Sequence, residues 1–148
     1  MFDRILVAVG GHDASLEPAR VAGRLACLLG SQLTIVSVHR PAPSVLGEPF
    51  YSESLIPRLE EADTMLDRAR ELATAEGAFE PQVESLEGDP AVRIGSLARD
   101  GGFALVVMGT RRRGRVEAAL LGSVSAAVAA HSTAPVMIVP EQPSADAR

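Results

Sequence analysis

The sequence predicts a single-domain, three-layer α/β sandwich, in which a five-stranded parallel sheet carries helices on both faces. Five short segments rich in Val, Ile and Leu alternate with segments whose apolar residues recur at helical spacing. Several of the strand segments are apolar at consecutive positions, which is typical of parallel strands covered on both faces. The chain has 148 residues, of which 47% are hydrophobic, and this length and composition suit one packed core.

The first strand, the first helix and the second strand are expected at residues 3–9, 15–29 and 32–38. The first strand contains Arg-Ile-Leu-Val-Ala-Val and is followed by two glycines, which end it. In the helix, apolar residues recur three and four positions apart. Pro18 lies in its first turn, where the missing N–H costs no helical hydrogen bond. The second strand is rich in β-branched residues, which favour an extended backbone.

Residues 39–54 are predicted to form a long loop, because they contain four Pro or Gly residues and show no clear periodicity. Long loops in compact domains are often lids or partner surfaces. We therefore expect residues 41–54 to be the most mobile internal segment and to lie over or beside the ligand cleft. Residues 55–75 follow as an amphipathic helix with charged side chains on its outer face.

The second half of the chain continues the alternation of strands and helices. A short strand is expected at 82–86. The next helix should begin after it, because Asp89 can cap a helix and Pro90 suits a first helical position. The last two strands are expected at 103–108 and 136–139, and the last helix is expected between them at 123–131. Residues 141–148 are expected to be a flexible polar tail, so that the domain spans residues 1–140.

Ligands of parallel α/β sheets bind beyond the carboxyl ends of the strands, where the strand order reverses. We expect the residues that follow these strand ends to form one site. They are Gly10, Gly11, His12, Val38, His39, Gly88 and the residues from Gly109 onward.

The stretch 106–125 has the features of an anion site. An apolar strand leads into a loop that contains four arginines, and Gly122 and Ser123 then precede the last helix. Unpaired N–H groups and the positive end of the helix dipole meet at a helix start, and small residues let a phosphate approach the backbone. The arginines suit a phosphate clamp, but such a run is also typical of a solvated loop, and both interpretations stay open. They are Arg111, Arg112, Arg113 and Arg115.

The composition excludes several classes of function. The chain has no Lys, so neither a P-loop lysine nor Schiff-base chemistry is available. A net charge of −5 and an aromatic content of 3% disfavour nucleic-acid binding. Three scattered His and one Cys form no metal-ligand pattern, and we interpret Cys27 as a small buried hydrophobe. Because no apolar run reaches membrane-spanning length and no signal-like start is seen, we expect a cytoplasmic protein without membrane contact.

With these residues the chain resembles the universal stress protein family, from Ile5-Leu-Val-Ala-Val9 to Pro135-Val-Met-Ile-Val-Pro140. The resemblance implies the strand order 3-2-1-4-5. In members that bind ATP, the motif is Gly, two residues, Gly, nine residues, Gly and then Ser or Thr. Gly109 matches its first position and Gly122-Ser123 its last, whereas Arg112 stands at the middle glycine.

The end of the first strand is a second departure from the family pattern, because Gly10 stands where members usually carry an Asp that helps to hold the adenosine part. Val38 matches the position whose backbone commonly meets adenine. The two departures imply weak or altered nucleotide binding. The nucleotide-binding residues that the resemblance implies are Gly10, Val38, Gly109, Thr110, Arg111, Arg112, Gly122, Ser123, Val124 and Ser125.

Three functions stay open. The first is a stress-response or regulatory protein with an adenine-nucleotide site for ATP or AMP, in which the nucleotide changes a partner surface. The second is a nucleotide-free dimeric interaction module that acts through partner binding. The third is a small hydrolase or phosphotransferase, which we disfavour, expecting at most weak ATP hydrolysis. No Lys is present, and Ser123 and Ser125 lack a Gly-x-Ser-x-Gly elbow and an assembled acid and base.

The fifth strand is an edge strand in the implied order, yet it is apolar on both faces and carries no Lys or central Pro to block pairing. We expect a homodimer in which two such strands pair antiparallel about a two-fold axis, as in many members of the family. The residues are Val136, Met137, Ile138 and Val139.

Overall fold

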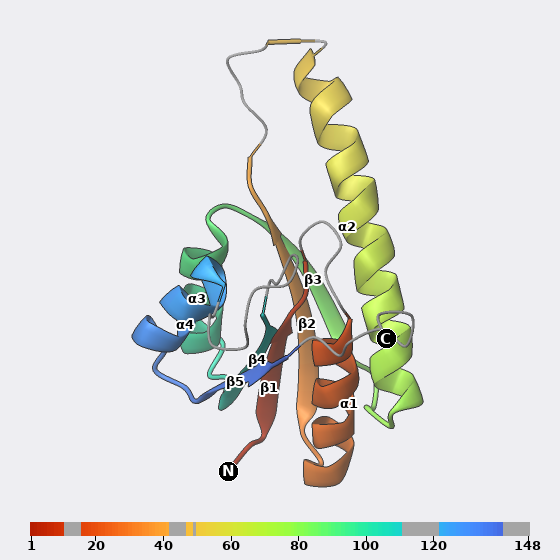
Figure 1. Ribbon diagram of the computed structural model, residues 1–148. Coiled ribbons are helices and arrows are strands. Elements are labelled where there is room, and N and C mark those ends of the chain that lie inside the picture. Colours follow the sequence, from red (N-terminus) through yellow and green to blue (C-terminus); the bar gives the residue numbers. More distant parts are fainter. Residues whose placement is uncertain (11–15, 42–46, 49, 111–121, 141–148) are drawn as a thin grey trace, which may run out of the picture.

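A computed structural model of the chain describes residues 1–10, 16–41, 47–48, 50–110 and 122–140. Its five strands form one parallel sheet in the order β3-β2-β1-β4-β5 (Figure 1), which confirms the predicted fold class and strand order. The strands are β1 (Arg4–Ala8), β2 (Gln32–His39), β3 (Gln82–Glu87), β4 (Leu105–Gly109) and β5 (Val136–Val139). The helices are α1 (Glu17–Leu29), α2 (Phe50–Ala75), α3 (Pro90–Asp100) and α4 (Ser123–His131).

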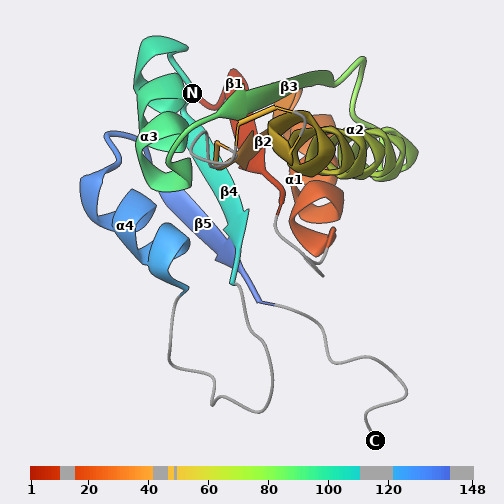
Figure 2. The same cartoon turned by 90° about the horizontal axis from the view of Figure 1, so that it is seen from above.

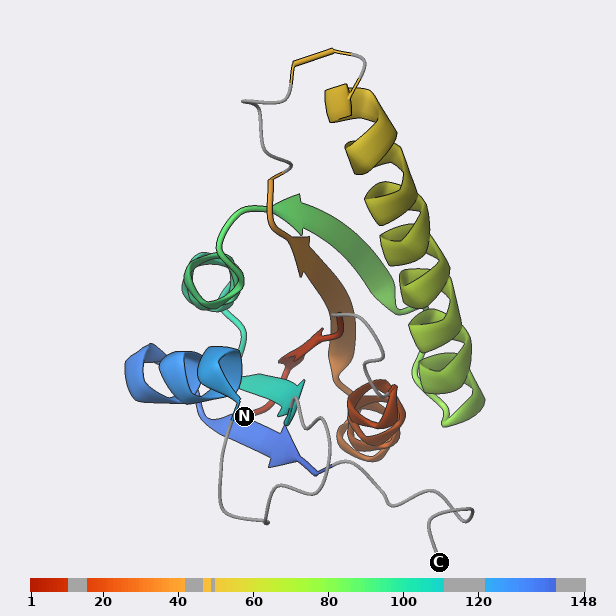
Figure 3. The same cartoon turned by 45° about the horizontal axis from the view of Figure 1, so that its top comes forward.

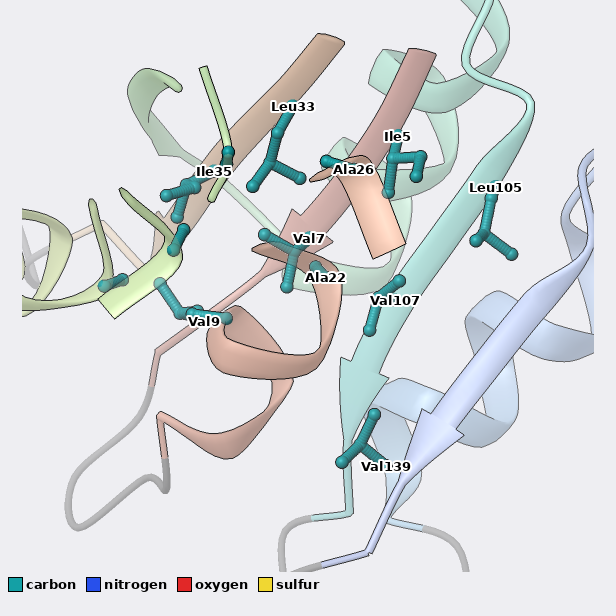
Figure 4. Close-up of a cluster of buried hydrophobic side chains, with 14 of the residues drawn as sticks. Ile5, Val7, Val9, Ala22, Ala26, Leu33, Ile35, Leu105, Val107 and Val139 are labelled. Atoms are coloured by element: carbon teal, nitrogen blue, oxygen red, sulfur yellow. The ribbon is translucent and has the colours of Figure 1, made fainter. Parts of the chain in front are cut away.

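The helices cover both faces of the sheet, with α1 and α2 on one face and α3 and α4 on the other (Figure 2). Side chains of β1 alternate between the two resulting cores, because successive residues of a strand point to opposite faces. Ile5 and Val7 pack among residues of α1 and α2 (Figure 4), whereas Leu6 packs with Ile94 and Val128 of α3 and α4. Both cores consist mainly of aliphatic side chains, as the composition indicates.

The helix α2 begins at Phe50, so the prediction of a loop up to residue 54 was wrong for residues 50–54. Pro57 lies inside the helix and has no N–H to donate, but the helix continues on both sides of it. The amino-terminal part of α2 extends beyond the strand ends (Figures 1 and 3), and Ile56 is 53% exposed, against 4% for Leu66 beside the sheet. Residues 42–46 and 49 lie outside the described residues, so their expected mobility stays a prediction.

Cys27 is exposed, so its interpretation as a buried hydrophobe was wrong. In α1 the sheet-facing positions are Ala22 and Ala26, and Cys27 lies about 100° further around the helix. The next residue, Leu28, is 70% exposed. The end of α1 therefore exposes apolar residues. Helical spacing alone could not distinguish them from the residues of its buried face.

The start of α3 follows the predicted capping pattern. The Asp89 side chain accepts a hydrogen bond from the Val92 N–H at 3.1 Å, and Pro90 is the first helical residue. No helix in the described part of the chain is long and apolar enough to cross a membrane.

Candidate functional site

A cleft opens at the carboxyl edge of the sheet, where the neighbouring strands β1 and β4 end. From β1 the chain continues to α1 on one face, whereas the helix after β4 is α4 on the other, so the cleft lies at a topological switch point. The empty space within it is about 660 Å³, part of which is open to solvent. The described residues that line it are Ala8, Val9, Gly10, Pro18, Val38, Pro90, Ile94, Met108, Gly109, Thr110, Val124, Ser125 and Val139.

Two glycines at the strand ends shape the mouth of the cleft. Gly10 has φ +149°, which side-chain-bearing residues rarely adopt, and a Cβ there would lie 3.3 Å from Ser37 Oγ. A Cβ on Gly109 would lie 3.0 Å from Pro18 Cγ, so any side chain there would press on the first turn of α1. Glycine at both positions avoids these contacts and leaves the two strand ends without side chains.

Three helices begin around the cleft, because Pro18, Pro90 and Val124 line it from the first turns of α1, α3 and α4. None of the described lining residues is charged. The positive ends of the helix dipoles therefore meet uncharged and mostly apolar side chains, an arrangement that favours a ligand with one anionic and one apolar part.

The start of α4 is shaped by a glycine. Its N-cap residue is Gly122, which has no side chain to cap the first N–H groups. The Ser125 hydroxyl donates to the Gly122 carbonyl at 3.0 Å and is 3% exposed, so it stabilises the turn without occupying those N–H groups. The first N–H groups of a helix are its usual anion-binding groups.

Two buried polar atoms in the described part of the chain have no hydrogen-bond partner, and both lie near the carboxyl edge. One is Oγ1 of Thr110, whose backbone N–H donates to the Val139 carbonyl at 3.4 Å. The other is Nδ1 of His39, whose Nε2 lies 3.8 Å from a carboxylate oxygen of Glu87 on the adjacent strand. His39 is not among the lining residues, whereas Thr110 is.

The structure brings six of the ten sequence-predicted site residues around the cleft, and their role as nucleotide ligands stays a prediction. They are Gly10, Val38, Gly109, Thr110, Val124 and Ser125. Gly122 and the exposed Ser123 adjoin the cleft at the start of α4 without lining it. Arg111 and Arg112 lie outside the described residues, as do Gly11 and His12.

Sequence reasoning missed the lining residues from α1 and α3, and Val139 from β5. Pro18 and Pro90 carried a usable signal, because each is a first-turn proline of a helix that follows a carboxyl strand end. Ile94 and Val139 carried none, because their place at the cleft depends on packing. In the described residues, no three His, Cys, Asp or Glu side chains come together as metal ligands.

Comparison with known proteins identifies the family of this chain. A family model described as the Universal stress protein family matches residues 1–140. A protein of Thermus aquaticus named "Universal stress protein in QAH/OAS sulfhydrylase 3'region" is 39% identical over 139 residues, covering 94% of this chain and 99% of that protein. Universal stress protein YxiE of Bacillus subtilis is 33% identical over 150 residues, covering 94% and 99%.

A solved structure shares both the fold and part of the sequence. It is described as a universal stress protein in complex with cAMP, and it superposes with a TM-score of 0.73 at 26% identity. The match covers 93% of this chain and 96% of that chain.

Proposed function

The chain belongs to the universal stress protein family, and we propose that it binds an adenine nucleotide in the cleft at the carboxyl edge. The observation that carries this proposal is the cleft itself, in which uncharged and mostly apolar side chains meet the start of α4, whose N-cap residue is a glycine. A nucleotide has the matching parts, a flat base and an anionic phosphate. The similar structure with cAMP supports the same class of ligand.

We assign the base to the apolar wall of Val38, Ile94 and Met108, and the phosphate to the region of Gly109, Gly122 and Ser123. Unpaired N–H groups at the start of α4 would donate to the phosphate oxygens. Arg111 and Arg112 are proposed as further phosphate contacts on the sequence pattern alone. ATP and AMP are both candidates, and the missing carboxylate at Gly10 leads us to expect weaker binding than in members that carry Asp there.

Nucleotide titration by calorimetry tests this function, with AMP, cAMP and ATP as the ligands. The variant Ala8→Leu places a larger side chain in the cleft and should abolish binding, whereas Ala129→Leu makes the same change at an exposed position of α4. Circular dichroism should show that both variants are folded. If the unaltered protein binds none of the three nucleotides, or if both variants bind equally, the proposal is wrong.

The biological role that we propose is a cytoplasmic stress-response or regulatory protein whose nucleotide state changes a partner surface. The strand β5 supports a second candidate, a dimeric module that acts without nucleotide. This strand is at the edge of the sheet, and Val136, Met137 and Ile138 are only partly buried although apolar. The two candidates differ in whether nucleotide co-purifies with the protein. With no Trp in the chain, ultraviolet absorbance after denaturation would show it clearly.

A further inference from the structure

We propose that a pocket at the amino edge of the sheet binds a small organic cation, an ammonium or guanidinium group on an apolar body. The pocket lies between the last turn of α1 and the turn that joins α2 to β3, at the opposite edge of the sheet from the cleft. The empty space within it is about 810 Å³, part of which is open to solvent. A ligand bound here would not enter the cleft, and its binding does not depend on the proposed function.

Two helices end beside this pocket, on the side where β2 and β3 begin (Figure 1). From α1, the last-turn residue Cys27 and the C-cap residue Gly30 line the pocket, and so does Gly77, which follows the end of α2. Neither helix has a basic residue in its last turn. Cations are stabilised at this end of a helix, because the dipole is negative there and the last carbonyl groups lack partners within the helix. The helix ends therefore favour a positively charged ligand.

The described lining of the pocket carries one charge, the carboxylate of Glu80, and no basic residue. Both arginines of α1 pair with Glu76, at 3.3 and 3.7 Å, and Glu80 has no ion-pair partner among the described residues. The Ser31 hydroxyl already donates to the Phe2 carbonyl, so its oxygen is left as an acceptor. A carboxylate and a hydroxyl acceptor without a basic neighbour suit a ligand that donates hydrogen bonds and carries a positive charge.

The turn that carries Phe79 and Glu80 has an unfavourable conformation. Phe79 is 81% exposed although it is apolar. Glu80 has φ +44°, the only positive φ of a non-glycine residue in the described part of the chain, and it precedes Pro81, although a residue before proline favours an extended backbone. Strained residues are concentrated at functional sites. An exposed aromatic ring next to a carboxylate suits an organic cation, because the face of the ring attracts positive charge.

Cys27 provides a reporter within the pocket, because it is exposed and is the single cysteine of the chain. A Cβ on Gly77 would lie 2.5 Å from Cys27 Sγ, so the thiol lies against the turn that follows α2. A ligand in the pocket should cover this thiol. We therefore expect the cation agmatine to slow the alkylation of Cys27 by iodoacetamide.

Agmatine, which carries a guanidinium and an ammonium group on a short alkyl chain, is also the probe for an NMR titration of the ¹⁵N-labelled protein. We expect saturating shifts of the amides of Cys27, Gly77 and Glu80, whereas the neutral analogue N-butylurea should cause none. Glu80→Gln should bind agmatine about fivefold or more weakly. Phe79→Leu should bind it about threefold more weakly. Glu84→Gln is the matched control, because it removes the same charge at an exposed position of β3 outside the pocket, and it should bind agmatine unchanged.

Glu80→Gly separates binding from folding. Glycine adopts a positive φ without strain, so this variant should melt roughly 2–4 °C higher than the unaltered protein and still lose affinity for agmatine. If agmatine causes no saturating shifts at the pocket, or if N-butylurea binds as well, the pocket is not a cation site. If Glu80→Gln and Glu84→Gln weaken binding equally, agmatine is attracted only by the acidic surface, and the assignment is wrong. Ala8→Leu, which alters the cleft, should bind agmatine as the unaltered protein does, so a failure of the proposed nucleotide site would be seen separately.

Discussion

Gly10 shows how one residue can limit which side chains the end of a strand accepts. Its φ of +149° and the Ser37 hydroxyl 3.3 Å from an added Cβ leave little room for any side chain. An Asp here, as the resemblance to the family implies for members that hold adenosine, would therefore strain the backbone, and we expect that this substitution alone does not restore such a contact.

Gly10→Asp is expected to lower the free energy of unfolding by about 1–3 kcal/mol, because a side chain is forced into this backbone conformation. We expect no gain in AMP affinity, although the substitution supplies a carboxylate. Urea unfolding and calorimetric titration measure the two effects. Gly10→Ala is the control that carries the strain without the charge. Tighter AMP binding at unchanged stability would contradict the expectation.

Glu17 is a residue whose pKa is perturbed by a defined partner. Hydrogen bonds from Arg20, one of them with Nε 3.0 Å from Oε2, and its positive charge hold the pKa of the Glu17 carboxyl below the usual 4.5. Arg20 also lies 3.3 Å from Glu76, which follows α2, so the pair links the first turn of α1 to the end of α2.

The Glu17 contribution to stability should depend on pH in a defined direction. Its pKa is lower in the folded state, so the carboxylate stabilises the fold above about 4.5, and this contribution is lost as the pH falls through the lower folded pKa. Glu17→Gln should therefore be less stable than the unaltered protein at pH 7 and equally stable in strong acid. The effect should be small, because the Arg20 side chain is 46% exposed and water weakens its interaction with Glu17. Thermal melts of the variant and the unaltered protein across this pH range measure the difference in stability, with Glu60→Gln as the control. A difference that does not shrink as the pH falls would contradict the expectation.

At the level of elements, the crossing of α1 and α2 depends on one glycine. A Cβ on Gly23 would lie 2.6 Å from the Cα and 2.8 Å from the carbonyl oxygen of Ala73. The two helices therefore touch backbone to backbone, and a side chain could enter only if α2 moved. Because Ala69 and Ala73 are fully buried in the same core, such a movement would disturb the packing against the sheet.

Gly23→Ala is expected to lower the free energy of unfolding by about 1–3 kcal/mol through overpacking. The matched control is Gly95→Ala in α3, where an added Cβ would have no atom within 4 Å. That variant should gain about 0.5–1 kcal/mol, because Ala favours a helix more than Gly. Chemical denaturation of both variants measures opposite signs for the same substitution, and equal effects would show that the helix crossing is not tight.

At the level of the whole molecule, the two edges of the sheet differ in character. The edge strand β3 exposes polar residues such as Gln82, Glu84 and Ser85, which discourage pairing with another chain. The edge strand β5 consists of Val, Met, Ile and Val and carries no charged residue. An open apolar edge is a template for strand pairing, and a two-fold axis lets identical edges pair.

We expect the protein to be a dimer at micromolar concentration and Ile138→Asp to be a monomer, because a charge in the pairing edge would lose its hydration. Ser85→Asp introduces the same charge at the other edge and should leave the dimer intact. Light scattering coupled to gel filtration measures both. A monomeric unaltered protein, or a dimer that survives Ile138→Asp, would rule out pairing through β5.

The periodicity of the sequence determined the strands, most of the helices and the composition of the core. Strands such as β5 and starts such as Asp89-Pro90 of α3 depend on side chains a few residues apart, so they can be recognised locally. The strand order came from the resemblance, and with it the expectation that Gly10, Val38 and Gly109 share one edge. Their common edge follows from parallel topology, because parallel strands end on the same side.

Only the tertiary structure decided which of these residues meet and what their atoms contact. The exposure of Cys27, the start of α2 at Phe50 and the contact of Gly23 with Ala73 depend on where helices end and cross, which local spacing does not encode. The unpartnered hydroxyl of Thr110 likewise emerges only once β4, β5 and α4 are packed together. Hydrogen-bond satisfaction is a property of all neighbouring atoms in space, and those neighbours come from segments far apart in the chain.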